Sequence, residues 1–261
     1  MAKQKELLSD LHIPGIVPSI SIDCVVFGYL EKKLHVLLIK YKDTQSWTLP
    51  GGFLYEGAEM DETATNIVSS RTGIDNVYLN QFYTFSSLDR HWKHKKKDWE
   101  CLQTLLAKLP ERDQKPFEEL MIQRYISTAY FVLLDAAEVR VKPDIHGQLC
   151  NWISLSEIPE LVLDHNEIVN KAIRALRKRL NFLPIGKTLM PEKFTMSDFQ
   201  TLYEAILGKY LDRGNFQRKI MKLGFLIRHE KLMTGAQNKA PYLYSIDHEV
   251  YDKLVAEGIG F

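Results

Sequence analysis

The chain has 261 residues, enough for one large domain or two smaller ones, and its hydrophobic content of 45% suits a packed globular core. No stretch approaches the ~18 continuous apolar residues of a membrane span, and the N-terminus lacks the apolar region of a signal peptide. Cys24, Cys101 and Cys150 are odd in number and show no CxxC spacing, which favours a reducing compartment. We therefore expect a cytoplasmic protein without disulfides or membrane spans.

The net charge of +1 hides an asymmetry along the chain. Residues 170–261 carry 16 Lys and Arg against 9 Asp and Glu, a balance of +7, whereas residues 1–169 carry 18 against 24, a balance of −6. This division indicates two domains, the second with a polyanionic partner. An ordinary drift of charge along the chain is the alternative.

Strand-like and helical segments alternate irregularly in the first two thirds of the chain. This order favours an α/β sandwich with a mixed sheet over a parallel array of βαβ units. The expected elements are hairpin strands at 19–29 and 34–41, a helix at 60–71, and strands at 77–85, 125–134 and 151–153.

The stretch 51–74 reads GGFLYEGAEMDETATNIVSSRTGI and follows Leu49-Pro50. It resembles the Nudix box, a loop-helix-loop that binds metal and cleaves nucleoside diphosphates linked to another group. The metal needs several carboxylates at i, i+3 and i+4, because only that spacing points them from one helix face. The first acid of the family pattern falls here on Ala58, its Arg-Glu pair on Asn66 and Ile67, and its Glu-Glu pair on Ser70 and Arg71. None of these residues is a carboxylate. The sequence therefore predicts no metal site, no catalytic residue and no hydrolysis.

Between the third and fourth of these strands lies a long segment, 90–123, that begins RHWKHKKKDW. The following stretch, WECLQTLLAKLP, predicts a short amphipathic helix. The basic run could contact phosphate or could form a solvated face, and the sequence leaves both open.

A helix is expected from a cap at Asp164 to about Leu180, and NFLPIG at 181–186 then breaks the chain. We place the domain boundary there. The predicted domains are 1–183, a sensing domain with an insertion at about 91–123, and 184–261, a DNA-binding domain.

The second domain shows the order helix, helix, hairpin. Thr195 and Gly208 bound the first helix, and Asp212 and Gly224 bound the second. Strand-like runs at 225–228 and 241–246 enclose a basic loop, as in a winged helix. A small helical cap with a solvated basic face is the alternative.

On the second helix Phe216, Ile220 and Leu223 form the apolar stripe, so the opposite face is free for DNA. The residues expected to contact DNA are Arg213, Asn215, Gln217, Arg218 and Lys222 on the helix, and Lys231 and Lys239 on the wing.

The whole chain resembles the Nudix-related transcriptional regulators, which join a degenerate Nudix domain to a C-terminal winged helix. The resemblance rests on SIDCVVFGY, WTLPGGF, YLNQFYTFSSLDR, ISTAYFVLL, WISLSEIPELVLDHNEIV and MPEKFTMSDFQTLYEAILG…DRGNFQRKI. It implies a homodimer that binds palindromic double-stranded DNA, with a small effector: ADP-ribose in some members, a sugar in others. The insertion departs from the family and leaves the effector open.

We expect the effector in the cleft near Lys40, Trp47, Gly52, Arg71 and Arg90, because the frame of the cleft is kept and cations stand where the Nudix pattern has metal ligands; no cofactor is expected to be required. The leading hypothesis is an effector-responsive transcription regulator that acts as a repressor. A Nudix hydrolase with unusual metal ligands and a ligand-binding module without DNA function are the alternatives.

Overall fold

The computed structural model describes residues 16–75, 77–141, 149–182, 185–232 and 240–258. They form two compact units: the first spans the chain through Phe27, Val36–Val132 and Val139–Ile173, and the second spans Gly28–His35, Leu133–Glu138 and the chain from Arg174. The expected boundary at 183/184 lies outside the described residues and stays a prediction. No helix in the described ranges has both the length and the apolarity needed to cross a membrane.

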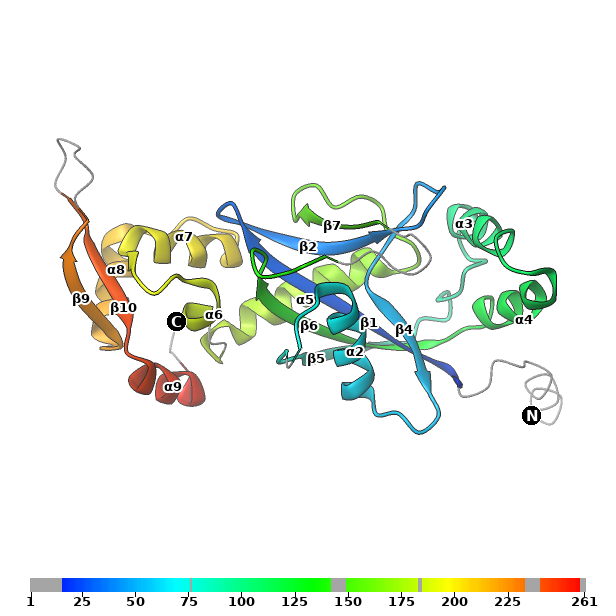
Figure 1. Ribbon diagram of the computed structural model, residues 1–261, viewed down its shortest axis with the longest axis horizontal. Helices are drawn as coiled ribbons and strands as arrows, with labels where there is room; N and C mark the ends of the chain where they lie inside the picture. Colours follow the sequence, from blue (N-terminus) through cyan, green and yellow to red (C-terminus); the bar gives the residue numbers. More distant parts are fainter. Residues whose placement is uncertain (1–15, 76, 142–148, 183–184, 233–239, 259–261) are drawn as a thin grey trace. The chain divides into compact units, whose positions relative to one another are not determined.

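The first unit is built on a seven-stranded sheet (Figure 1). Its strand order is β3-β2-β1-β6-β5, with β4 paired to β1 and β7 to β2. The pairs β1–β4, β2–β3 and β5–β6 are antiparallel. The strands are β1 (Ile16–Leu30), β2 (Lys33–Lys40), β3 (Trp47–Thr48), β4 (Gly51–Tyr55), β5 (Asn80–Phe85), β6 (Ile126–Asp135) and β7 (Leu149–Ser154).

The predicted hairpin is confirmed as β1–β2. Glu31 and Lys32 form its turn with φ values of 49° and 61°. Two successive positive φ angles match the right-handed twist of the flanking strands, although Asn or Gly usually occupies such positions.

Two helices pack apolar faces onto the core of this sheet. The helix α2 (Met60–Thr72) buries Ala64 and Val68, and Gly73 ends it in the left-handed conformation with φ 71°. The helix α5 (His165–Arg179) buries residues including Ile168, Val169 and Ala172. Both helices were expected from the sequence, and their observed ends lie within one residue of the expected ones.

The insertion folds into two helices, α3 (Lys96–Leu106) and α4 (Glu111–Met121), which pack together in Figure 1. Only α3 was expected; α4 contains Pro116, a residue that disfavours a helix interior. Tertiary packing overrides that preference: residues of both helices bury apolar side chains in one cluster with the 162–163 segment. Its members are Trp92, Cys101, Leu102, Leu106, Met121, Tyr125, Val162 and Leu163.

The second unit contains a three-stranded sheet with the order β8-β10-β9. Its elements are the 3-10 helix η1 (Leu180–Phe182), α6 (Ile185–Leu189), β8 (Phe194–Thr195), α7 (Met196–Leu207), α8 (Arg213–Lys222), β9 (Leu226–Lys231), β10 (Tyr242–Ile246) and α9 (His248–Glu257). The order α7, α8, β9, β10 is that of a winged helix. The sequence did not predict α6, β8 or α9.

Local capping signals in the second unit were read correctly. Thr195 and Asp198 form a reciprocal capping box at the start of α7, and Gly208 ends that helix with φ 65°. Asp212 accepts a hydrogen bond from the Asn215 amide at the start of α8. A buried aromatic cluster holds these helices on the sheet, with Phe199, Tyr203, Phe216, Phe225 and Tyr251 at 0–3% exposure.

Candidate nucleic-acid interface and effector cleft

The helix α8 has one buried face and one exposed face. Phe216 and Ile220 are 3% and 0% exposed and anchor the helix, while Leu223 is only half-buried. Asn215, Arg218 and Lys222 are exposed on the other side, as are Arg213 and Gln217. The predicted division between core stripe and outward face is therefore present.

Two of these outward residues interact with each other. The Arg218 guanidinium donates to the side-chain oxygen of Asn215, one helical turn earlier. Amide and guanidinium groups are the side chains that bond base edges in the major groove, and this bond orients them together. Their contact with DNA stays a prediction.

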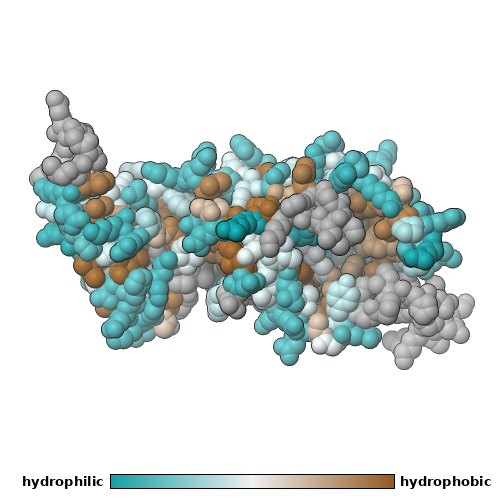
Figure 2. Space-filling view, in the orientation of Figure 1, coloured by the Kyte–Doolittle hydropathy of each residue, from teal (hydrophilic) through white to brown (hydrophobic). Residues whose placement is uncertain are grey.

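The wing presents a second group of cations. Arg228 and Lys231 on β9 lie over the ring of Tyr242 on β10, at 4.8 Å and 5.3 Å from its centroid. Lys231 was expected here, whereas Arg228 was missed because it was read only as part of a strand. Lys239 lies outside the described residues. Hydrophilic side chains cover much of this unit on the face drawn in Figure 2.

In the Nudix-box segment, helix α2 places an apolar side chain, Ile67, next to Gly52. Ile67, where the family pattern has a glutamate, points its Cδ1 to within 3.6 Å of the position that a Cβ on Gly52 would occupy. Ser70 is exposed, and Ala58 precedes α2. Within the described ranges, no group of three His, Cys, Asp or Glu side chains lies close enough to hold a metal ion.

A cavity of about 130 Å³ is lined by residues of the sheet, of Gly51–Gly52 and of the insertion. Residues from β1, β4 and the start of α5 line it, together with residues from the insertion and its C-terminal flank. The lining residues are Ser21, Asp23, Tyr41, Thr48, Leu49, Gly51, Gly52, Phe53, Trp92, Met121, Tyr125, Leu163 and His165.

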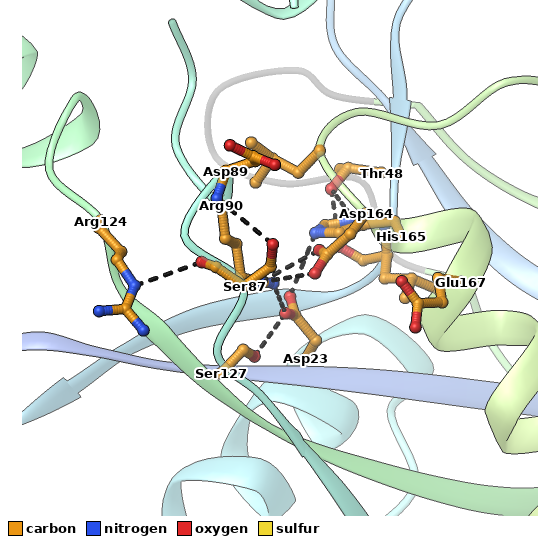
Figure 3. A network of polar contacts seen from close by, with 12 residues as sticks. Asp23, Thr48, Ser87, Asp89, Arg90, Arg124, Ser127, Asp164, His165 and Glu167 are labelled. Atoms are coloured by element: carbon orange, nitrogen blue, oxygen red, sulfur yellow. Dashed lines mark hydrogen bonds and ion pairs between the residues drawn. The ribbon is translucent and has the colours of Figure 1, made fainter. Parts of the chain in front are cut away.

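A buried ionic network (Figure 3) includes two of these lining residues, Asp23 and His165. One terminal nitrogen of Arg90 donates to Asp23 Oδ2 at 2.6 Å, and its Nε donates to Asp164 at 3.1 Å. Ser127 Oγ donates to the same Asp23 oxygen at 2.5 Å. Burial by itself would raise the pKa of Asp23, but the neighbouring His165, Arg90 and Ser127 outweigh it, so the pKa lies below its ordinary value.

His165 is held by the backbone on one side and faces Asp23 on the other. Its Nδ1 accepts a hydrogen bond from the Leu49 amide at 3.1 Å and lies 3.1 Å from Thr48 Oγ1. Because Nδ1 is an acceptor, the neutral ring carries its proton on Nε2, which lies 3.6 Å from Asp23 Oδ1. Burial lowers the pKa of His165, with Arg90 acting in the same direction.

The predicted effector residues are divided between different places. Gly52 lines the cavity. Lys40 lies over the Trp47 ring at 5.7 Å and lines a separate surface hollow, and Arg71 is half-buried near the end of α2. Arg90 is fully buried in the network and does not line the cavity. Their role in effector binding stays a prediction.

The sequence analysis did not identify Asp23 and His165, which line the cavity, or Asp164, which accepts a hydrogen bond from Arg90. One signal could have found the first: Asp23 is a charged residue inside the apolar strand SIDCVVFGY, where a carboxylate needs a buried partner.

The basic run of the insertion is largely engaged with the protein itself. Lys95 donates to the Leu163 carbonyl at 2.5 Å, and Lys97 donates to Glu160 at 3.1 Å. These contacts favour a structural role for both lysines over the phosphate-contact interpretation.

Comparisons with known proteins agree with this architecture. Residues 186–246 match the family model described as the NrtR DNA-binding winged helix domain. A curated relative, the ADPR responsive transcriptional repressor NtrR of Acinetobacter baylyi, is 24% identical over 242 residues, covering 90% of this chain and 84% of the relative.

Over most of its length the chain is similar to Nudix-related transcriptional regulators, and residues 186–246 match their winged-helix domain. Solved structures of this family share its fold over most of its length. Shewanella oneidensis NrtR has a TM-score of 0.60 at 20% identity, with coverage of 89% of this chain and 96% of that one. The structure of the same protein complexed with a 27mer DNA has a TM-score of 0.59 at 19% identity, with coverage of 89% and 95%. The predicted fold class, a Nudix-type α/β sandwich with a C-terminal winged helix, is confirmed.

Proposed function

We propose that this regulator is a DNA-binding transcriptional repressor whose Nudix-type unit senses a small effector. The observation that carries the proposal is α8: its apolar stripe is committed to the core of a winged-helix unit, and its exposed face holds Asn215, Arg218 and Lys222. A helix of this kind enters the major groove in winged-helix proteins. Double-stranded DNA as the target also fits a cytoplasmic location.

The effector belongs to one of two classes, ADP-ribose or a sugar. ADP-ribose is supported by the relative described as ADPR responsive. The cavity in the first unit supplies a site for a small ligand. Effector binding releases DNA if the effector prefers a conformation of lower DNA affinity.

We further propose a homodimer that reads a palindromic operator. A two-fold axis relating two α8 helices would place them on half-sites separated by whole helical turns. Light scattering of the free protein and of its complex with a duplex would give two protomers per operator. A single protomer per duplex would contradict this arrangement.

The test of function is fluorescence anisotropy with labelled DNA from upstream of the protein's own gene. We expect sequence-specific binding that weakens when the effector is added. ADP-ribose turnover in Mg²⁺ should be measured on the same preparation. An EDTA-sensitive rate near the ~10 s⁻¹ typical of enzymes, without specific DNA binding, would support the hydrolase alternative instead.

A further inference from the structure

The helix α5 begins at the cavity of the first unit. His165, its first residue, lines the cavity, and the Nδ1 atom of His165 accepts a hydrogen bond from the Leu49 amide at 3.1 Å. The preceding residue, Asp164, accepts a hydrogen bond from Arg90 Nε at 3.1 Å. The first turn of α5 is thus bonded to the cavity lining and to the buried network. A ligand in the cavity would therefore act directly on the start of this helix.

The same helix continues into the second unit. It runs without interruption from His165 to Arg179, and the division between the two units falls within it, after Ile173. At a rise of ~1.5 Å per residue, the 165–177 segment is ~18 Å long. An α-helix is stiff because its backbone hydrogen bonds join successive turns. A displacement of the first turn of α5 is therefore carried to its last turns.

Arg177, in the last turn of α5, holds the end of α7, and both lie in the second unit. Its Nε donates to the Ile206 carbonyl at 3.0 Å. This is one of the last carbonyls of α7, which have no partner within their own helix. The guanidinium also covers Gly208, where a Cβ would collide with Nη2 and lie 3.2 Å from Cζ of Arg177. Arg177 is therefore in contact with the residues at which α7 ends.

Side-chain hydrogen bonds stiffen the turn between α7 and α8. Glu204 on α7 accepts from the Leu211 amide at 2.8 Å, and Gln200 donates to the Leu211 carbonyl at 2.8 Å. Gln200 also donates to Glu204 at 3.0 Å, so the three residues form a closed ring of hydrogen bonds. The next residue, Asp212, caps α8 by accepting from the Asn215 amide at 2.9 Å. The start of α8 therefore follows a movement of the end of α7.

We propose that Arg177 is a positioning residue that couples the cavity to the recognition helix α8. When an effector displaces the first turn of α5, Arg177 shifts the end of α7 at Ile206 and Gly208, and α8 moves with it. Arg177 acts through these backbone contacts and binds neither the effector nor a base. This inference rests on the proposed function, because it takes an effector in the cavity to change the DNA affinity. It adds the residue through which that change is transmitted.

The test compares four forms of the full-length protein: wild type, Arg177→Met, Arg177→Lys and the control Arg174→Met. Arg174 is an exposed arginine on the same helix, so the control removes the same charge. Anisotropy with the operator duplex gives the DNA affinity of each form with and without effector. The probes are ADP-ribose and a panel of free pentoses and hexoses. Calorimetry gives the affinity of each form for the probe that changes DNA binding in the wild type.

We expect the effector to weaken DNA binding of wild type and of Arg174→Met by a factor in the range of about 5–150, as is typical of allosteric coupling. Both Arg177 variants should bind the operator and the free effector within about threefold of Arg174→Met, yet the effector should change their DNA affinity by less than about twofold. Arg177→Lys should behave as Arg177→Met does, because a single ammonium group cannot both bond the Ile206 carbonyl and cover Gly208.

A wild-type response to the effector in either Arg177 variant would overturn the inference and leave the proposed regulator intact. Loss of the response in Arg174→Met would also overturn it, since charge removal alone would then explain the effect. So would a loss of operator or effector affinity in the Arg177 variants that is large enough to account for their lost response. If no probe changes the DNA affinity of the wild type, the proposed sensor function fails, and the coupling through Arg177 fails with it.

Discussion

Gly51 shows how a single residue is constrained by the buried network. It pairs with Asp23 across β1–β4, and a Cβ at Gly51 would lie 2.6 Å from Asp23 Oδ1 and 2.9 Å from the Ile22 carbonyl. The neighbouring Gly52 has more room, because its nearest contact would be Ile67 at 3.6 Å. The glycine pair of the Nudix box therefore contains one position that backbone packing requires and one that it does not.

We expect Gly51→Ala to lower the free energy of unfolding by about 1–3 kcal/mol, since the methyl group would push apart β1 and β4. Gly52→Ala is the matched control and should change it by less than about 1 kcal/mol. Urea denaturation of both variants measures the difference. Equal losses in the two variants would contradict the close approach at Gly51.

The pH dependence of the free energy of unfolding should reflect the titration of the His165 ring. Its pKa in the folded protein lies below its unfolded value, so at mildly acidic pH the unfolded chain binds more protons and stability falls as the pH falls. The free energy of unfolding of the wild type should begin to fall as the pH drops below about 7. Below the unfolded pKa of ~6.5 the loss should approach ~1.4 kcal/mol per pH unit. Urea titrations at several pH values measure this slope.

His165→Gln should flatten the slope between about pH 6.5 and pH 5, because it removes the titrating ring and leaves the other groups in place. Asp23 also has a lowered pKa, but its contribution is lost only at more acidic pH, below its unfolded value. If His165→Gln keeps the wild-type slope between about pH 6.5 and pH 5, the pH dependence of stability arises from other groups.

At the scale of single elements, the recognition helix carries the central prediction. Neutral substitution of Asn215, Arg218 and Lys222 together should abolish selection of the operator without unfolding the protein, because all three are exposed. Arg218→Ala alone should cost about 1–3 kcal/mol of binding free energy if it reads a base. Anisotropy with operator and scrambled duplexes measures both effects.

A control variant separates base reading from total charge. Lys209→Ala with Lys253→Ala removes two exposed cations of the same unit that lie outside α8. It should retain operator selection, since phosphate neutralisation alone carries no sequence information. The recognition helix is misassigned if the Lys209→Ala, Lys253→Ala control loses operator selection, or if the triple α8 variant keeps it.

Elements with local signals were predictable from the sequence, and elements defined by distant packing were not. The α7 and α8 ends follow from Thr195, Gly208 and Asp212, whose effects act within one helical turn. In contrast, α4 contains Pro116 and forms because its apolar residues pack on α3. The strand β8 has two residues and exists only through pairing with β10.

The candidate site shows the same limit more strongly. Gly52 was found from a motif, but Asp23, Asp164 and His165 meet only after folding, and no short pattern links them. The effector residues chosen as cations, Lys40 and Arg90, fall outside the lining of the cavity. A motif locates a cleft, whereas the chemistry of its floor depends on tertiary contacts.

For the whole molecule, DNA affinity should depend steeply on salt, since phosphate contacts release counterions. Lys231→Ala should weaken all duplexes alike and reduce the slope of log K against log salt by about one, because Lys231 is an exposed wing residue. The same change was expected for Lys239. Titrations at several salt concentrations measure the slope, and a sequence-dependent loss in Lys231→Ala would instead indicate base reading.

The spacing of the network along the chain has a consequence for synthesis on the ribosome. Arg90 bonds partners 67 and 74 positions away, Ser127 bonds one 104 positions away, and Thr48 contacts one 117 positions away. Contacts over such separations form late, because the intervening chain must first be ordered. The nascent sensing unit thus keeps Asp23 and Arg90 incompletely paired until the 164–165 segment emerges. We expect premature termination before that point to yield chains that chaperones retain or proteases degrade, rather than a free sensor.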